Sequence, residues 1–448
     1  MYTTISTIAE GKSGDFPFSV KKTKPAHEVA SDAPVKPLPA LSEEQQVVHD
    51  YALAWSMDKL PADVQRPPSK RLLTLGGFGG TGKSTVVAHL AKLLQELCIS
   101  HAFCTYTGKA SQVLRRKLRQ VGISPQFCGT IHSLIYEPES DSNGRVIDWR
   151  RQPELGYSLL IVDEASMLDE DIFKDLKSYR IPILAVGDHG QLPPIQGTFS
   201  LMDNPFLRLE KIHRQAEGNP IISLADTVRR TGFIPRPLLM ETNPNLVVRA
   251  ARGIPGSWID KVFTDQDAAW DSAILTYTNA SRTGYNEIIS KKLGVGLDRG
   301  FPIQMIWLKN QKFGALKINN GQRCYLMEAS QLPRGRMLGR FYFPDDNIEI
   351  TCHFLQRQIG RHKTFAGLDE VQDETGFRFR SWEDLGALVD YGYALTVHKA
   401  QGDQWKNVLI EAFRPAQSDA DNYRRWLYTG ISRAAENCWV AAGSSTVG

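Results

Sequence analysis

Short apolar runs alternate with amphipathic stretches along most of the chain. The runs RLLTL, HAFCTY, SLLIVDE and IPILAVGD are each short enough for a buried strand, and each is followed by polar residues. The stretch STVVAHLAKLLQEL places its apolar side chains at helical spacing: Val86, Val87, Leu90, Leu93, Leu94 and Leu97. Buried strands that alternate with amphipathic helices predict a parallel sheet with its ligand site at the carboxyl edge.

A second set of the same kind follows later in the chain. SAILTYTN, VLIEAF and NCWVAAG predict a second α/β domain, while residues 295–388 consist of shorter strand-like pieces broken by Gly, Asn and Pro. We therefore expect an α/β protein with two parallel-sheet domains and a small all-β insertion. The expected divisions are a flexible N-terminal tail (1–40), a first domain (41–200), a second domain (201–294 plus 389–448) and the insertion (295–388).

Composition adds few constraints to this picture. A chain of 448 residues suits two or three domains, and its net charge of +4 is compatible with a polyanionic partner without establishing one. The six cysteines are scattered without a C-x-x-C pair, which favours reduced thiols and a cytoplasmic protein. No run of about 18 apolar residues and no signal-peptide pattern is visible, so we expect no membrane association. The tail lysines fit a solvated leader better than a nucleic-acid contact.

The stretch GGFGGTGKST, between a predicted strand and a predicted helix, has the spacing of a phosphate-binding loop. Its glycines let the backbone N–H groups curl around phosphates, and the helix adds its positive N-terminal end. Lys83 is expected to reach the β- and γ-phosphates, and the Ser84 hydroxyl is expected to bind Mg²⁺. The predicted ATP-binding residues here are Gly77, Gly79, Gly80, Thr81, Gly82, Lys83, Ser84 and Thr85.

Acidic and amide side chains follow two further strands. Asp163 and Glu164 end the run LLIVDE, where Asp163 suits the Mg²⁺ shell and Glu164 suits deprotonation of the attacking water. Gln191, in VGDHGQLPPI, is placed to contact the γ-phosphate or that water. Phosphoryl transfer also needs cations that neutralise charge in the transition state, and Arg214 and Arg433 are our candidates.

The ordered run of motifs resembles superfamily 1 helicases of the RecD/Dda-like branch, superfamily 1B, from about residue 41 to 435. The matching stretches are LSEEQ, GGFGGTGKST, TYTGKAS, GTIHSLI, IVDEASM, VGDHGQLPPI, LEKIHRQ, YALTVHKAQGDQW and LYTGISRA. The resemblance implies two RecA-like domains that enclose ATP, with Arg214 and Arg433 projecting from the second domain. It also implies that Gln45 reads adenine, and we assign Gly402 to the nucleotide as well.

The same resemblance implies that single-stranded DNA crosses both domains on the face opposite ATP. Short hydroxyls and single cations suit phosphate contacts that do not read sequence. The predicted strand contacts are Thr107, Lys109, Thr130, His132, Asn279, Thr396, His398 and Lys399. Expected partners are single-stranded and tailed duplex DNA, with single-strand-binding or replication proteins as further candidates, and the protein is expected to act as a monomer.

Two insertions match positions that carry devices in related helicases. Asn143-Gly144 predicts a β-hairpin over about 134–152, where relatives have a pin that splits the duplex, although its tip is acidic and lacks an aromatic wedge. Trp149 serves that role only if it faces the fork. Residues 295–388 occupy the position of an SH3-like subdomain.

The leading hypothesis is an ATP-dependent DNA helicase that moves 5′ to 3′, a polarity that comes from the resemblance alone. An RNA helicase of the same superfamily stays open, because contacts to the 2′-hydroxyl are not legible in the sequence. A nucleic-acid-stimulated ATPase that remodels complexes without unwinding stays open as well. A degenerate binding module is disfavoured because every proposed catalytic residue is present.

Overall fold

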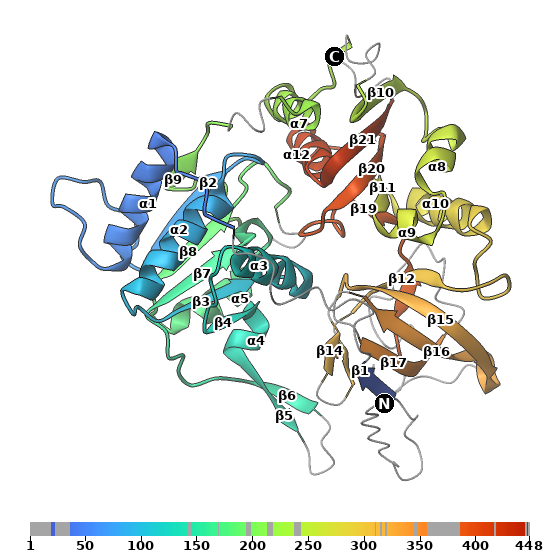
Figure 1. The fold of residues 1–448 in the computed structure, drawn as a ribbon, viewed down its shortest axis with the longest axis horizontal. Coiled ribbons are helices and arrows are strands. Elements are labelled where there is room, and N and C mark those ends of the chain that lie inside the picture. The colour runs from blue at the N-terminus through green and yellow to red at the C-terminus, as the bar shows by residue number, and fades with distance from the viewer. Residues whose placement is uncertain are drawn as a thin grey trace.

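The computed structural model contains three bodies and a projecting hairpin (Figure 1). The structure describes residues 19–22, 36–140, 146–168, 170–193, 199–212, 218–236, 243–309, 311–313, 316–318, 320–344, 348–355, 386–415, 418–443 and 446. The two α/β bodies, which we call the first and second lobes, lie side by side, and the all-β body lies below the second lobe in this view.

The first lobe is built on a six-stranded parallel sheet of order β4-β3-β7-β8-β2-β9. The strands are β2 (Leu72–Gly77), β3 (His101–Thr105), β4 (Phe127–Thr130), β7 (Leu159–Asp163), β8 (Ile183–Gly187) and β9 (Leu207–Leu209). The helices are α1 (Glu43–Ser56), α2 (Lys83–Glu96), α3 (Gly108–Gln120), α4 (Ile131–Ile135), the 3₁₀ turn η1 (Ala165–Met167) and α5 (Glu170–Ser178). Because β9 pairs with β2, this lobe continues beyond residue 200, where we expected it to end.

The second lobe has a five-stranded parallel sheet of order β10-β21-β20-β11-β19. Its strands are β10 (Leu246–Ala250), β11 (Ser272–Thr276), β19 (Ala394–Thr396), β20 (Trp405–Ala412) and β21 (Ala434–Ala442). Its helices are α7 (Pro220–Thr231), α8 (Gly256–Val262), α9 (Gln266–Trp270), α10 (Asn279–Lys292) and α12 (Ala420–Ile431). The expectation of two parallel-sheet domains is therefore confirmed.

The all-β body is an antiparallel sheet of order β1-β17-β16-β15-β12-β18, beside a small β13-β14 hairpin. Its strands are β1 (Ser19–Lys22), β12 (Ile303–Trp307), β13 (Gln311–Phe313), β14 (Leu316–Ile318), β15 (Arg323–Leu332), β16 (Arg336–Phe343), β17 (Ile348–Leu355) and β18 (Val389–Tyr391), with a 3₁₀ turn η3 (Pro333–Gly335). Two of these strands come from outside the expected insertion. Part of the expected flexible tail forms β1 along β17, and β18 lies just past residue 388.

A two-stranded hairpin projects from the first lobe near α4 (Figure 1). It pairs β5 (Tyr136–Ser140) with β6 (Val146–Arg151), in the place where the sequence predicts one. The expected Asn143-Gly144 turn and acidic tip lie outside the described residues. Its role as a pin stays a prediction.

One core side chain crosses between the lobes. Leu192 follows β8 of the first lobe, yet it is 3% exposed and belongs to an apolar cluster of the second lobe that includes Leu224 and Val397. The loop after β8 is therefore packed into both lobes. None of the helices in the described residues combines the length and the apolar content that a bilayer span requires.

Candidate nucleotide site between the two lobes

The phosphate-binding loop joins β2 to α2 through a backbone that requires glycine. Gly80 and Gly82 have φ of 84° and 81°, a left-handed conformation that side chains disfavour. A Cβ at Gly77 would lie 2.6 Å from Thr81 Oγ1. The loop is therefore tightly curled, and its N–H groups lie at the positive N-terminal end of α2.

Lys83 and Ser84 begin α2, as the motif predicts. Lys83 Nζ donates hydrogen bonds to the carbonyl oxygens of Gly77 at 2.6 Å and of Phe78 at 3.1 Å. The ammonium group thus lies over the inside of the loop, and Ser84 is exposed in the first turn of the helix. Thr85 lies one residue further along the same helix.

Gln45 supports this loop from α1. It is 2% exposed, and its Nε2 donates to the carbonyl oxygen of Thr81 at 3.1 Å. Its Oε1 accepts from Ser42 N at 3.0 Å as part of a capping box. Both ends of the amide are thus bonded within the protein, and the adenine contact stays a prediction.

Asp163 is the last residue of β7, and Glu164 follows it. Strand β8 lies between β7 and β2, the strand that leads into the phosphate-binding loop. Glu164 has a left-handed backbone with φ of 54°, and its N–H donates to Asp163 Oδ1 at 2.9 Å. Burial, together with the nearby charge of Asp163, raises the pKa of Glu164. The positive charges of Arg433 and Lys83 oppose this rise in pKa. A carboxylate with a raised pKa is suited to accept a proton from an attacking water.

The side chains at this site are compatible with a magnesium ion whose ligands come mainly from the phosphates of the nucleotide. Mg²⁺ prefers oxygen ligands, and in nucleotide sites it takes one or two protein oxygens together with phosphates and waters. Asp163 and Ser84 offer such oxygens, and one carboxylate oxygen of Asp163 is engaged by a backbone N–H. Within the described residues there is no cluster of three or more His, Cys, Asp or Glu side chains that suits a metal ion.

A tyrosine from the second lobe reaches into this site. Tyr428, on α12, is 2% exposed, and its hydroxyl donates to Asp188 Oδ2 at 2.7 Å and accepts from Gly79 N at 3.0 Å. Asp188 also accepts from Gly190 N at 2.9 Å and from Gln191 Nε2 at 3.3 Å. One hydroxyl therefore joins the phosphate-binding loop, the β8 loop and the second lobe.

Sequence reasoning missed this tyrosine. Tyr428 stands in LYTGISRA, the motif from which only Arg433 was selected. Its neighbours Trp426 and Leu427 are also buried, so the spacing gave no sign that one aromatic residue faces the site.

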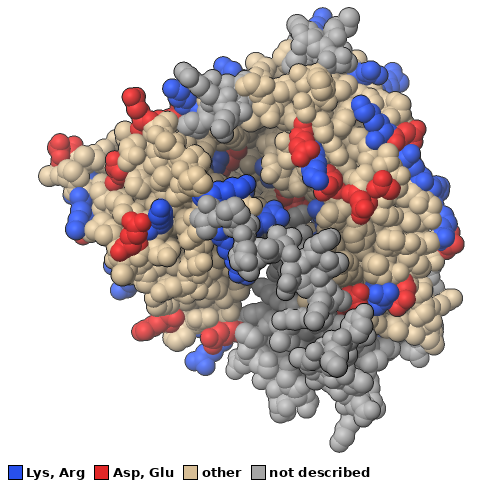
Figure 2. Space-filling view, viewed as in Figure 1, with Lys and Arg blue, Asp and Glu red and all other residues tan. Residues whose placement is uncertain are grey.

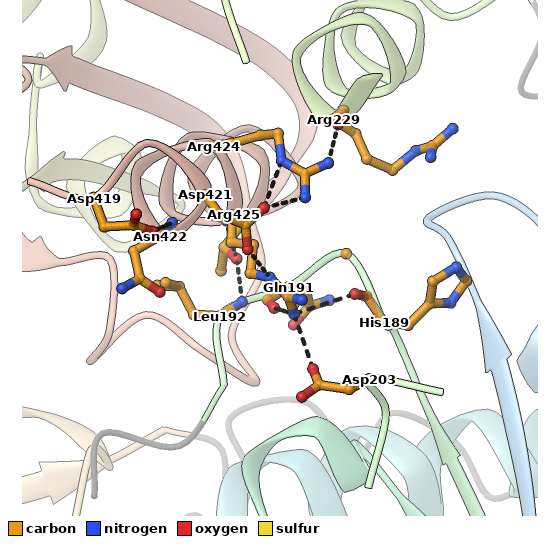
Figure 3. A network of polar contacts seen from close by, with 12 residues as sticks. His189, Gln191, Leu192, Asp203, Arg229, Asp419, Asp421, Asn422, Arg424 and Arg425 are labelled. Carbon is orange, nitrogen blue, oxygen red and sulfur yellow. Dashed lines mark hydrogen bonds and ion pairs between the residues drawn. The ribbon is translucent and has the colours of Figure 1, made fainter. Parts of the chain in front are cut away.

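The second lobe also grips the backbone of the β8 loop (Figure 3). Arg425 of α12 donates to the carbonyl oxygens of His189 and Gln191, both at 3.4 Å, and lies 3.4 Å from a carboxylate oxygen of Asp203. Asp421 holds the same guanidinium at 3.0 Å. The position of Gln191 relative to the nucleotide site therefore depends on the second lobe.

Two further hydrogen bonds complete the attachment of this loop. Leu192 N donates to Thr429 Oγ1 at 3.0 Å, and Gln401 Nε2 donates to the carbonyl oxygen of Leu192 at 3.0 Å. Gln401 lies two residues after Lys399 and three after His398, both of which are predicted strand contacts. The loop thus connects the nucleotide site with the segment expected to hold the strand.

Aromatic and cationic side chains stack across the cleft. The guanidinium of Arg229, on α7, lies 3.7 Å from the ring centre of Phe78, and the ring centres of Phe78 and His189 are 4.0 Å apart. Burial lowers the pKa of His189 to about 4, so this ring is neutral near pH 7. A cavity of about 160 Å³ opens beside the stack, lined by Gly79, Gly80, Asn219, Asp226 and Tyr428 among others.

Arg433 follows α12 and is 6% exposed. Its guanidinium donates to the carbonyl oxygens of Thr429 at 3.2 Å and Asp403 at 3.3 Å, and to Ser432 Oγ at 3.0 Å. These bonds hold the cation in the cleft, where its charge acts on Glu164. The other proposed cation, Arg214, lies outside the described residues.

The predicted strand contacts gather at the carboxyl edges of both sheets. Thr107 and Thr130 use their hydroxyls to cap α3 and α4, by accepting from Ala110 N at 3.2 Å and Ser133 N at 3.1 Å. The other contacts occupy corresponding positions: Lys109 in α3, His132 in α4, Asn279 at the start of α10 and Thr396 at the end of β19. These hydroxyls therefore have structural roles, and their contacts with a strand stay predictions.

His398 and Lys399 follow β19 and are largely withdrawn from solvent. Burial lowers the pKa of His398. Burial and the nearby charge of Arg282 lower the pKa of Lys399 to about 8. Arg282 itself forms a buried ion pair with Asp390 at 2.8 Å.

Gly402 has φ of 78° and lies against the first lobe. A Cβ at this position would lie 3.2 Å from Thr107 Oγ1 and 4.0 Å from Met167 Sδ. The structure thus places Gly402 beside the start of α3, and its proposed contact with the nucleotide stays a prediction.

The chain is similar in sequence to helicases. Residues 391–441 match the UvrD-like helicase C-terminal domain, and residues 63–197 match an AAA domain. The chain is 27% identical to the ATP-dependent RecD2 DNA helicase of Deinococcus radiodurans, over 98% of this chain and 54% of that protein. It is 21% identical to the RecBCD enzyme subunit RecD of Buchnera aphidicola, over 81% of this chain and 69% of that protein.

The chain thus spans about half the length of the RecD2 relative. Among solved structures, Bacteroides Pif1 bound to single-stranded DNA aligns with a TM-score of 0.48 and 16% identity, over 90% of this chain and 92% of that one. The sequence matches confirm the resemblance to RecD-like superfamily 1B helicases.

Proposed function

We propose that this chain is an ATP-dependent DNA helicase that moves 5′ to 3′ along single-stranded DNA and separates the duplex ahead of it. The observation that carries the proposal is the bridge formed by Tyr428. From the second lobe, its hydroxyl contacts both Gly79 of the phosphate-binding loop and Asp188, which belong to the first lobe. Because both lobes complete the nucleotide site, the free energy of nucleotide binding changes when the distance between the lobes changes. ATP turnover is thereby coupled to opening and closing of the cleft.

The residues of the cleft have separate roles in the proposed hydrolysis. Lys83 and the N-terminal end of α2 bind the phosphates, and Glu164 accepts the proton of the water whose oxygen attacks the γ-phosphorus. The bond from that phosphorus to the bridging oxygen breaks, and ADP leaves with the electron pair. Arg433 and Lys83 balance the negative charge that develops. Asp163 and Ser84 would hold Mg²⁺, which would supply further charge neutralisation.

Coupling to DNA passes through the β8 loop. Gln191 reports the state of the phosphates, and Leu192 is bonded to Thr429 and Gln401 of the second lobe. Gln401 adjoins the proposed strand contacts His398 and Lys399, so closing of the cleft moves those contacts relative to Thr107 and Thr130 of the first lobe. Repeated cycles then advance the strand. The relative named as a DNA helicase supports DNA as the substrate.

A tailed-duplex assay tests the proposal. We expect unwinding of a duplex with a 5′ single-stranded tail in the presence of ATP and Mg²⁺, and no unwinding of the 3′-tailed duplex or in the absence of ATP. Unwinding of the 3′-tailed duplex alone would reverse the polarity. An ATPase rate that single-stranded DNA leaves unchanged would refute the coupling.

Two further measurements, of ATPase stimulation and of movement along a single strand, separate the two remaining alternatives. Stronger stimulation of the ATPase by RNA than by DNA would indicate an RNA helicase. Movement along single-stranded DNA without strand separation would indicate a translocase that remodels complexes.

A further inference from the structure

Helix α3 carries a positive charge that is not balanced within the helix. Its 13 residues, GKASQVLRRKLRQ, contain basic side chains and no acidic one. Four of these basic residues form a nearly continuous run of exposed positions: Arg115, Arg116, Lys117 and Arg119. Exposed helices usually carry acidic side chains among the basic ones. The purely basic charge of α3 is therefore unusual for a helix face that contacts only solvent.

Two exposed lysines on other helices of this chain have acidic neighbours within the same helix. Lys174 of α5 lies 3.0 Å from Glu170, and Lys291 of α10 lies 2.6 Å from Glu287. In the part of the chain that the structure describes, no ion pair within 4.0 Å involves the four cations of α3. Their charge is thus available to an external anion.

The position of α3 links this charge to the proposed path of the strand. The helix begins at the cap residue Thr107, and Arg115 donates a hydrogen bond to the carbonyl oxygen of Cys128 in β4, two residues before Thr130. At the other end of the helix, Lys36 N donates to the carbonyl oxygen of Gln120 at 2.9 Å, and Lys36 is exposed. Figure 2 shows Lys and Arg gathered near the centre of this face, where Figure 1 places α3.

We propose that this α3 surface, made of Lys36, Arg115, Arg116, Lys117 and Arg119, binds phosphates of single-stranded DNA beyond the groove between the lobes. The inference rests on the proposed helicase function and extends the strand path along the first lobe. Single-stranded DNA is the occupant because α3 begins at the predicted contact Thr107, and Arg115 is bonded two residues before the predicted contact Thr130, so the cations lead from these contacts along the helix. Flexible exposed cations hold phosphates without reading bases, which suits a motor that must pass over any sequence.

A pair of matched double variants tests the α3 surface. Arg116→Gln/Arg119→Gln removes two exposed cations three residues apart and leaves Arg115 on its carbonyl. The control, Lys174→Gln/Lys177→Gln, removes the same charge at the same spacing from α5 of the same lobe. Affinity for a long single-stranded oligonucleotide is measured for both variants over a range of salt concentrations.

Each phosphate contact with a single strand contributes about 0.7 to the slope of log affinity against log salt. We expect the α3 variant to lose about 1.4 from this slope and to bind about 25-fold more weakly at 0.1 M salt, since two such contacts are lost. The ATPase rate without DNA and the maximal rate at saturating DNA should stay at their original values. The charge-conserving variant Arg116→Lys/Arg119→Lys should restore the slope.

Three outcomes overturn the proposal. The first is a salt slope in the α3 variant equal to that of the unaltered protein, and the second is an equal loss in the α5 control. The third is a loss confined to blunt duplex DNA, which would assign the surface to the duplex. If the unaltered protein neither binds single strands nor is stimulated by them, the proposed function itself fails, and that result is distinct from the other three.

Discussion

Replacing Tyr428 with phenylalanine removes one oxygen atom from the contact between the lobes. The ring stays in place, but Asp188, which is 3% exposed, loses a hydrogen bond of 2.7 Å, and Gly79 N loses its acceptor at 3.0 Å. Burial and the charge of Asp188 raise the pKa of Tyr428 well above its usual value, so the hydroxyl is a donor at every working pH. The variant therefore deletes a hydrogen bond whose donor keeps its proton at these pH values.

The size of the effect follows from the charge of the acceptor. A hydrogen bond to a charged group contributes about 1.5–3 kcal/mol, and a loss of about 2 kcal/mol changes an equilibrium about 30-fold. If the closed cleft is the form that hydrolyses ATP, the DNA-stimulated kcat should fall roughly 10- to 30-fold. Affinity for single-stranded DNA without nucleotide should stay the same, because Tyr428 faces the nucleotide site. Steady-state ATPase and strand-binding assays measure the two quantities.

The same helix supplies a control for this variant. Tyr423 is 1% exposed, and its hydroxyl has no hydrogen-bond partner in the described part of the chain. Tyr423→Phe removes the same atom from α12 without breaking such a bond, so we expect kcat close to that of the unaltered protein. The reasoning about the bridge is refuted if Tyr428→Phe keeps full stimulated activity, or if both variants lose activity equally.

Three further predictions concern single residues of the cleft. Lys83→Ala should abolish ATP hydrolysis and leave strand affinity near its original value, and a fully active variant would contradict the assigned site. Glu164→Gln should bind ATP and Mg²⁺ yet hydrolyse very slowly, which a single-turnover assay would show; normal turnover would exclude Glu164 as the base. Because the pKa of His189 falls from 6.5 in the unfolded chain to about 4 in the folded one, the unfolded chain binds more protons between these values. Its contribution to stability is thus complete above pH 6.5 and is lost as pH falls toward 4. Denaturant midpoints should fall less steeply over this range in His189→Gln, and identical pH profiles would contradict the assignment.

Local pattern was sufficient for the strands and the phosphate-binding loop. Runs such as LLIVD are fully apolar because parallel strands are covered on both faces, and glycines mark the curled loop whatever surrounds it. The sequence also placed Asp163 and Glu164 correctly at a strand end. These features depend on neighbours in the chain, so they are legible without the fold.

Contacts between distant segments were not legible in the same way. Nothing in the pattern of LYTGISRA indicates that Tyr428 reaches Gly79, some 349 residues earlier. The short, polar segment Ser19–Lys22 has no apolar periodicity, and it forms a strand only because β17 offers an unpaired edge. Such contacts depend on how the lobes pack against each other, and the order of the motifs does not predict that packing.

The buried pair of Arg282 and Asp390 has a mechanical consequence. It fastens α10 of the second lobe to β18, an edge strand of the all-β body, with both side chains only 3% exposed. Only two residues separate β18 from β19, and Asn286 anchors Tyr393 N and Ala394 N there at 3.1 and 2.8 Å. The β body should therefore move with the second lobe as one rigid piece, so that in the proposed cycle only the junction between the two lobes needs to bend.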